Sequence, residues 1–162
     1  MDGDELAREL AQPGARALLQ SAPLARLAYD GPDGFPRVIP CGFFWNGAAI
    51  VVCTAATAPK VGALRARPQV AVTIDDASTP AGAQSLLVRG TARLDTVDGV
   101  PDEYLLAADK TMQGTDRAAF EQAVRATYDA MVRIAVTPEW ARFFDFGSGR
   151  LPRFLQALVS DQ

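Results

Sequence analysis

The segment RVIPCGFFWNGAAIVVCTAATAPK, residues 37–60, contains the features that decide the fold. Side chains alternate along 35–45 and again along 48–54, as is typical of β-strands. Asn46-Gly47 between them is a strong signal for a two-residue type I′ turn, because both positions of that turn need positive φ. The segment therefore predicts an antiparallel hairpin. Its first strand is largely apolar on both faces, which predicts a central position in the sheet.

A short helix is expected directly after this hairpin. Pro59 favours the first position of a helix, and Pro68 limits its end. The preceding residue, Ala58, has no side-chain oxygen, so the first N–H groups of the helix would be free to bind an anion. Thr57 is the alternative, because a boundary shifted by one residue would let its hydroxyl cap the helix.

Two cations and a hydroxyl are expected to meet at this helix start. Arg37 and Thr54 belong to strand ends, and Lys60 lies in the first helical turn. Positive side chains add to the partial positive charge of a helix N-terminus, where phosphate groups bind. Taken singly, Arg37 is an ordinary solvated charge and Lys60 an ordinary first-turn lysine. Their joint occurrence with Thr54 predicts a phosphate site.

The rest of the chain predicts short strands with helices at the margins. An N-terminal helical arm is expected over 1–20, interrupted at Pro13-Gly14, and a C-terminal helix within 147–162. Further strands are expected at 24–29, 69–75, 86–94, 133–137 and 140–146, and further helices at 101–112 and 116–131. Gly90 predicts a bulge or a close backbone contact, and Pro36 and Pro40 predict an interruption of their strand. This pattern predicts one mainly β domain over 1–162, a closed antiparallel barrel with peripheral helices.

The composition argues against several classes of function. The 162 residues are 49% hydrophobic and 22% charged, which suits one globular domain, and the net charge of -3 argues against a nucleic-acid partner. No apolar run approaches the roughly 20 residues of a membrane span and no leader is recognised, so a cytoplasmic protein without a membrane partner is expected. The chain has no histidine, so no metal site is expected, and Cys41 and Cys53 are expected to be buried, inert thiols.

Several motifs occur in an order that resembles one known family. They are Arg37-Val38-Ile39-Pro40, Trp45, Asn46-Gly47, Thr54, Lys60, Leu64, Pro68-Gln69-Val70 and Val88-Arg89-Gly90-Thr91-Ala92. This order resembles the pyridoxamine 5′-phosphate oxidase-like split barrels, over about residues 18–96. The resemblance implies an antiparallel split β-barrel that binds FMN or, as the alternative, the deazaflavin F420. It also implies that Arg37 and Lys60 hold the cofactor phosphate and that Thr54 adds further contacts.

The resemblance implies more about the cofactor ring and the assembly. The backbone of Val38, Ile39 and Pro40 would line the isoalloxazine ring, and Ser85, beside Gln84, would face it. The cofactor would lie between the two subunits of a homodimer. Trp140 is expected to serve packing, and the alternative is that Trp140 or Arg142 reaches across the dimer to cover the cofactor.

The chain also departs from the family pattern. Pro59 stands where a second basic residue often precedes the lysine, so the phosphate site has one charge fewer. The absence of histidine removes a residue that the pyridoxamine phosphate oxidase itself uses to hold its substrate phosphate. Oxidation of pyridoxamine phosphate is therefore disfavoured.

The sequence predicts an FMN- or F420-dependent oxidoreductase that transfers a hydride between the cofactor and an unknown small molecule. No side chain is assigned as a general acid or base, since no histidine is present and no carboxylates converge in the barrel segment. The proton could come from solvent, Tyr29 or the substrate. The alternative is a non-catalytic split-barrel module that holds flavin or haem for storage or sensing, and a third possibility is a structural barrel that binds protein.

Overall fold

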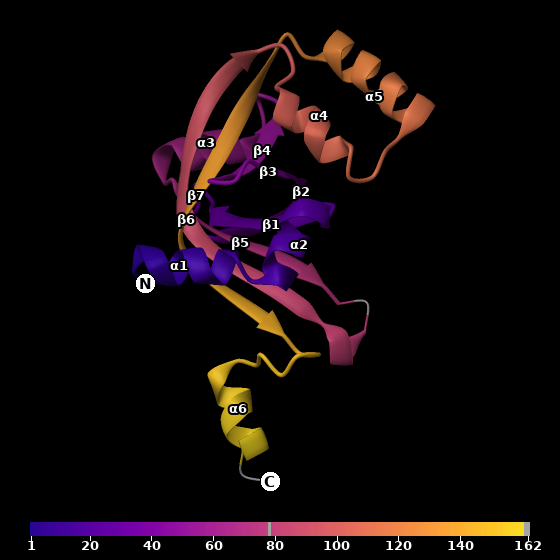
Figure 1. Ribbon diagram of the computed structural model, residues 1–162. Helices are drawn as coiled ribbons and strands as arrows, with labels where there is room; N and C mark the ends of the chain where they lie inside the picture. The colour runs from indigo at the N-terminus through magenta and orange to yellow at the C-terminus, as the bar shows by residue number, and fades with distance from the viewer. Residues whose placement is uncertain (78, 161–162) are drawn as a thin grey trace.

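A computed structural model describes residues 1–77 and 79–160, and this part of the chain forms one seven-stranded antiparallel sheet with six α-helices. The strand order is β2-β1-β5-β6-β7-β4-β3 (Figure 1). The strands are β1 (Leu24–Asp30), β2 (Pro36–Gly42), β3 (Phe44–Trp45), β4 (Ile50–Thr54), β5 (Gln69–Asp76), β6 (Gln84–Asp98) and β7 (Ala130–Asp145). The two edge strands, β2 and β3, are consecutive in sequence and joined by Phe43 alone, so the sheet curls into a barrel. The predicted split β-barrel is confirmed.

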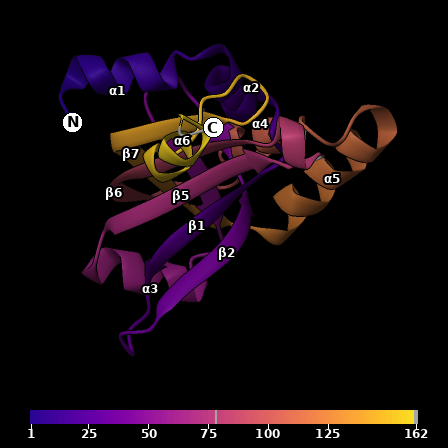
Figure 2. The ribbon, with the colours of Figure 1, turned by 90° about the horizontal axis from the view of Figure 1, so that it is seen from below.

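The helices surround this barrel. They are α1 (Gly3–Leu10), α2 (Pro13–Ser21), α3 (Pro59–Ala66), α4 (Asp102–Ala108), α5 (Gly114–Thr127) and α6 (Arg153–Ser160), with a 3₁₀ turn at Pro80–Gly82. Figure 1 shows α4 and α5 at one end of the long β6–β7 hairpin and α6 beyond the other end of β7. Seen from below, α1 lies beside β7 (Figure 2). Residues 161–162 of the predicted C-terminal helical segment, and residue 78 of the predicted loop, lie outside the described residues.

The barrel core forms because alternate side chains of the strands point inward. Fully buried members from five strands are Leu27, Ile50, Ile74, Leu86 and Ile134, and Phe43 between β2 and β3 and Leu19 of α2 pack among them. Burying each such side chain contributes about 1.5–3 kcal/mol. A second cluster of Val100, Leu105, Val124 and Met131 holds α4 and α5 against the end of the hairpin. We call α4, α5 and the loop between them, residues 102–127, the helical insertion.

The predicted central position of the strand at 35–45 is wrong. β2 lies at the edge of the sheet, and Val38 on its outer face is 63% exposed. Pro36 and Pro40 lack an N–H group, which is tolerated at an edge that forms no further ladder. The predicted interruption falls at Phe43, which separates β2 from β3.

The hairpin after Trp45 is confirmed, but the predicted type I′ turn is wrong. Trp45 pairs with Ile50, so four residues form the loop, and Gly47 has a φ of 93° whereas Asn46 has no positive φ. The side-chain oxygen of Asn46 accepts hydrogen bonds from the backbone N–H groups of Ala48 at 3.0 Å and Ala49 at 2.7 Å. Because the side chain satisfies these donors, the longer loop replaces the tight turn.

The two strands predicted at 133–137 and 140–146 form the single strand β7, interrupted by a bulge. Arg89 pairs with Trp140 and Gly90 with Pro138, so Glu139 is the extra residue. A Cβ atom at Gly90 would collide with the carbonyl group of Thr137. The close backbone contact predicted at Gly90 is confirmed.

The two predicted helices before β7 are shorter than expected. The first ends at Ala108 rather than near residue 112, and the second ends at Thr127 rather than at 131. Met131 therefore lies on β7, where it is still buried against Val124 of α5. The apolar spacing correctly predicted that Met131 packs with Val124, but Met131 belongs to β7 and not to the helix.

Candidate functional site

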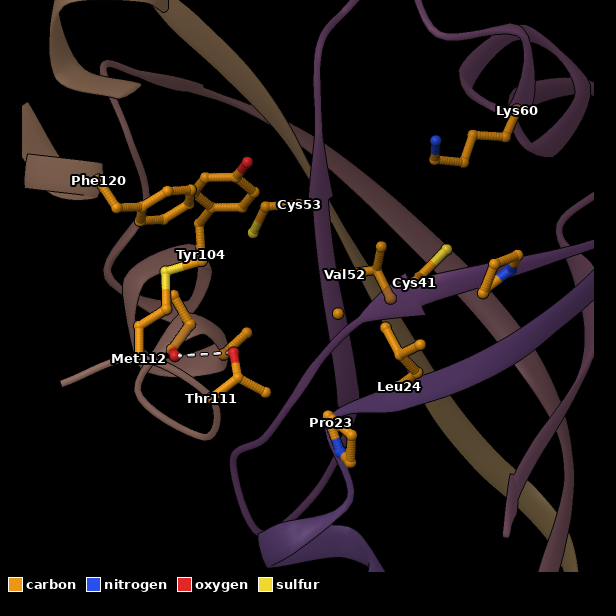
Figure 3. A pocket seen from close by; sticks show the side chains of 14 residues that line it. Pro23, Leu24, Cys41, Val52, Cys53, Lys60, Tyr104, Thr111, Met112 and Phe120 are labelled. Atoms are coloured by element: carbon orange, nitrogen blue, oxygen red, sulfur yellow. Dashed lines mark hydrogen bonds between the residues drawn. The ribbon is translucent and has the colours of Figure 1, made fainter. Parts of the chain in front are cut away.

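The barrel is split between β2 and β4. β3 pairs with β4 at Ile50 and Val51, and among the described strands no further partner covers the rest of that edge of β4. The helical insertion lies across this opening and encloses a cavity of about 470 Å³ (Figure 3). Its lining comprises Pro23, Leu24, Pro40, Cys41, Gly42, Val52, Cys53, Lys60, Tyr104, Ala107, Ala108, Thr111, Met112 and Phe120.

One end of the cavity is cationic. Lys60 lines it beside Pro40 and Cys41, and within the part of the chain that the structure describes Lys60 has no ion pair or hydrogen-bond partner. Burial raises the pKa of the Cys41 thiol, and the positive charge of Lys60 acts in the opposite direction. Figure 3 shows Lys60 and Cys41 on the side of the cavity away from Tyr104 and Phe120. Lys60 is therefore available to an anionic ligand.

The start of α3 beside Lys60 has the predicted form. Ala58 is the N-cap residue, its backbone is extended, no side chain caps the helix, and Pro59 occupies the first turn. The alternative cap, Thr57, is not used. Pro59 has no N–H group and the N–H of Val61 bonds the Ala58 carbonyl oxygen at 2.9 Å, so the start of the helix offers chiefly the N–H of Lys60 and its partial positive charge, which favours an anion.

The other end of the cavity is aromatic and comes from the helical insertion. The rings of Tyr104 and Phe120 stack with their centroids 5.8 Å apart and their planes 28° apart. Met112 lies beside them and faces the side of the cavity that carries Cys53 (Figure 3). Burial raises the pKa of Tyr104, and burial raises the pKa of Cys53 to about 12. Both groups are therefore neutral near pH 7.

Lys110, in the loop between α4 and α5, joins the insertion to the barrel. Its amine lies 3.4 Å from the centre of the Phe43 ring and donates to the carbonyl oxygens of Ala22 at 3.1 Å and Leu19 at 3.4 Å. These contacts hold the loop whose next residues, Thr111 and Met112, line the cavity. The sequence analysis missed this lysine, because no local pattern shows that its partners lie in the barrel.

The structure places Arg37 apart from Lys60. Arg37 lies near the start of β2, where its guanidinium donates to the Asp33 carboxylate at 2.6 Å, whereas Cys41 near the end of β2 lines the cavity beside Lys60. The hydrogen bond from Arg37 lowers the pKa of Asp33. Arg37 is not among the residues that line the cavity, so the two predicted phosphate ligands do not both line it.

Of the remaining predicted cofactor-binding residues, one lines the cavity and the others do not. Pro40 lines the cavity, Ile39 packs against the core, and Val38 points outward. Thr54 ends β4 next to the lining residue Cys53, while Ser85 lies at the other end of the sheet, paired with Asp75 and Phe144. Of the predicted set, the structure therefore brings Pro40 and Lys60 together. Whether these residues bind a cofactor stays a prediction.

Sequence reasoning missed the aromatic wall of the cavity. The apolar stripe of α5, which contains Phe120, could be recognised from its spacing, but its partner could not. Tyr104 reaches it from α4, and the contact depends on how the insertion folds back over the split.

Trp140 and Arg142 both contact other side chains of the same chain. The guanidinium of Arg89 lies 4.0 Å from the centre of the Trp140 ring. Arg142 donates to Glu9 and to Glu5, both at 3.1 Å. Both side chains have partners within their own chain, which supports the expected packing role.

Residues 1–77 and 79–160 contain no group of three or more histidine, cysteine or acidic side chains placed to hold a metal ion. Within the same residues, no helix combines the length and the apolar character needed to cross a membrane.

Comparison with known proteins connects this architecture to one family. The family model described as pyridoxamine 5′-phosphate oxidase matches residues 11–145. The chain belongs to the pyridoxamine 5′-phosphate oxidase family. The predicted resemblance is therefore confirmed, and it extends beyond the segment that carried it. No curated protein matches the chain.

Solved structures of relatives share the fold of this pyridoxamine 5′-phosphate oxidase family member. An F420 reductase is 28% identical, with a TM-score of 0.60 over 81% of this chain and 98% of that chain. A conserved hypothetical protein from Mycobacterium tuberculosis is 21% identical, with a TM-score of 0.66 over 94% of this chain and 90% of that chain. The haem storage protein HutZ from Vibrio cholerae is 17% identical, with a TM-score of 0.57 over 83% of this chain and 93% of that chain. The similarity to the last two of these structures, both under 25% identical, shows a shared fold.

Proposed function

We propose that this protein is an oxidoreductase that transfers a hydride between a flavin, FMN or the deazaflavin F420, and a small molecule. The observation that carries the proposal is Lys60 at the uncapped start of α3, which lines the cavity in the barrel split and has no charged partner among the described residues. Membership of the family and the similarity to an F420 reductase support it.

The residues at this end of the cavity fit the phosphate of such a cofactor. A charged hydrogen bond from Lys60 contributes about 1.5–3 kcal/mol, and the helix start would add the backbone N–H of Lys60 and its partial positive charge. Arg37 is already paired with Asp33 and does not line the cavity, so Lys60 would contribute the larger share. Thr54, at the end of β4, would add backbone and hydroxyl contacts.

The ring of the cofactor would lie along the backbone of Val38, Ile39 and Pro40. When bound, it supplies the hydride chemistry, and the protein supplies position and exclusion of water. No side chain of the cavity is assigned as a proton donor, because Cys53 and Tyr104 both have raised pKa values. Solvent or the substrate then supplies the proton.

A homodimer completes this proposal. Phe35 and Val38 at the edge strand are 70% and 63% exposed, and exposed apolar side chains beside a site are typical of an interface. The cofactor would lie between the two copies. Ser85 lies away from the cavity of its own chain, so its contact with the ring would come from the second copy.

The first experiment records the absorption spectrum of the purified protein and identifies the released ligand by mass spectrometry. Lys60→Ala should weaken cofactor retention by about tenfold or more, because a charged hydrogen bond is lost. Lys60→Arg should restore most of it. Arg65→Ala is the matched control, because Arg65 is an exposed residue of the same helix and its replacement also removes one positive charge.

Equal retention by Lys60→Ala and Arg65→Ala would refute the phosphate site. Turnover then separates enzyme from binding module. Reduction of the bound cofactor by NAD(P)H or reduced F420, followed by reoxidation with an acceptor, is expected of the oxidoreductase. A cofactor that stays bound and never exchanges a hydride would identify the storage or sensing module instead.

A further inference from the structure

The cavity in the barrel split has two chemically different halves, and the cofactor phosphate accounts for one of them. Lys60 and the start of α3 form the cationic half. The stacked rings of Tyr104 and Phe120, together with Met112, form the other half, which the helical insertion supplies. Figure 3 shows the two groups of side chains facing each other across the open space.

None of the described side chains that the insertion contributes to the cavity wall is charged. Glu103 and Arg133, the charged groups next to Cys53, bond each other at 2.8 Å. Arg117 of α5 is paired with Asp109 and Glu121. An ionised ligand would find no partner at this end, and burying an unpaired charge is costly.

The polar groups in this half are few and neutral. Burial raises the pKa of Tyr104 and brings that of Cys53 to about 12, so neither carries charge near pH 7. The Thr111 hydroxyl donates to the Ala108 carbonyl oxygen at 3.4 Å. The remaining contacts available to a ligand are aromatic faces, a thioether and alkyl groups, which favour a planar ring by about 0.5–1.5 kcal/mol for each aromatic contact.

We propose that the insertion half of the cavity binds the acceptor, and that this acceptor is an uncharged, planar, largely apolar ring compound. The inference deepens the proposed function and rests on it, because the cofactor occupies the Lys60 half. The helical insertion is then the specificity element of the enzyme.

The test uses two fluorescent probes that share one ring system. N-phenyl-1-naphthylamine is uncharged, and 8-anilino-1-naphthalenesulfonate is the same molecule with a sulfonate. Ala107→Phe fills the insertion half, since Ala107 lines the cavity. Leu106→Phe is the control, because its neighbour Leu106 is 41% exposed and does not line the cavity. Both substitutions add an aromatic ring to the same turn of α4.

The uncharged probe should bind the wild type and the Leu106→Phe variant equally well, and Ala107→Phe should weaken it by about tenfold or more. The sulfonated probe should bind more weakly than the uncharged one. An affinity for the uncharged probe that Ala107→Phe leaves unchanged would overturn the site. Tighter binding of the sulfonated probe than of the uncharged one, weakened by Ala107→Phe, would overturn the proposal that the acceptor is uncharged.

The absorption spectrum of the same samples keeps the two proposals apart. Ala107→Phe should retain the cofactor, whereas Lys60→Ala should lose it and still bind the uncharged probe. Probe binding in a protein that never carries a flavin would contradict the proposed function alone. Should Ala107→Phe fail to fold, Phe120→Leu gives the same test by removing the stacked ring, with the near-ultraviolet circular dichroism as the check of folding.

Discussion

The amine of Lys110 lies 3.4 Å from the centre of the Phe43 ring, and this contact joins the helical insertion to the closure of the barrel. Phe43 is fully buried between β2 and β3, where the two sheet edges meet. A cation above an aromatic face contributes about 0.5–2 kcal/mol, depending on its exposure. Because Lys110 precedes two cavity residues, the same contact positions the wall of the proposed acceptor site.

Lys110 should make the stability of the protein depend on pH. Burial lowers the pKa of Lys110 to about 8 from 10.5. Between these values the unfolded chain binds more protons than the folded chain, so the contribution of this group to stability rises with pH. The free energy of unfolding of the wild type should therefore increase relative to that of Lys110→Met between about pH 7 and about pH 10. A flat or opposite trend would show that the ring and carbonyl contacts outweigh burial.

Gly90 and Gly62 should respond in opposite ways to alanine. At Gly90 a Cβ atom would collide with the Thr137 carbonyl group, so Gly90→Ala should cost about 1–3 kcal/mol. At Gly62, in the exposed part of α3, a Cβ atom meets nothing within 4 Å. Gly62→Ala should stabilise by about 0.5–1 kcal/mol, because alanine favours the helix. Denaturant unfolding measures both, and equal effects would argue against the bulge in β7.

Glu9 should be more important for stability than its neighbour on the same helix. Burial opposes the ionisation of Glu9, but hydrogen bonds from the Phe143 N–H, Arg150 and Arg142 outweigh it and lower its pKa. Glu9→Ala leaves these donors without their acceptor and should cost about 1–3 kcal/mol. Glu5→Ala removes an exposed ion pair with Arg142 and should cost less than about 1 kcal/mol.

The lowered pKa of Glu9 also predicts a pH trend. Its contribution is present above 4.5, the ordinary value, and is lost as the pH falls through the folded-state pKa. Acid unfolding of the wild type should therefore approach that of Glu9→Gln at low pH. Curves that keep a constant separation would show that the carboxylate does not titrate in this range.

Much of the fold could be predicted from local patterns. Alternation located most strands, Pro59 located the start of α3, and Ala58 indicated that no side chain would cap it. Gly90 indicated a close backbone contact. Each of these features depends on a few consecutive residues, whose backbone preferences act within the segment itself.

The points at which the structure differs from the expected arrangement share one physical cause. The apolar faces of β2 suggested a central strand, but its neighbours in the sheet depend on where the chain closes the barrel. Arg37 and Lys60 were expected at one anion, yet Asp33 pairs with Arg37 at the other end of the strand. Spacing in sequence does not determine which charges meet, because the pairing depends on turns and on long-range contacts.

The sequence by itself determined most of the strands, the hairpin order and the uncapped start of α3, since these follow from side-chain alternation, proline geometry and capping. Tertiary structure alone decided that the helical insertion folds over the split, that Tyr104 stacks on Phe120, and that Lys110 reaches Phe43. These contacts join segments far apart in the chain, and packing between surfaces rather than local preference selects them.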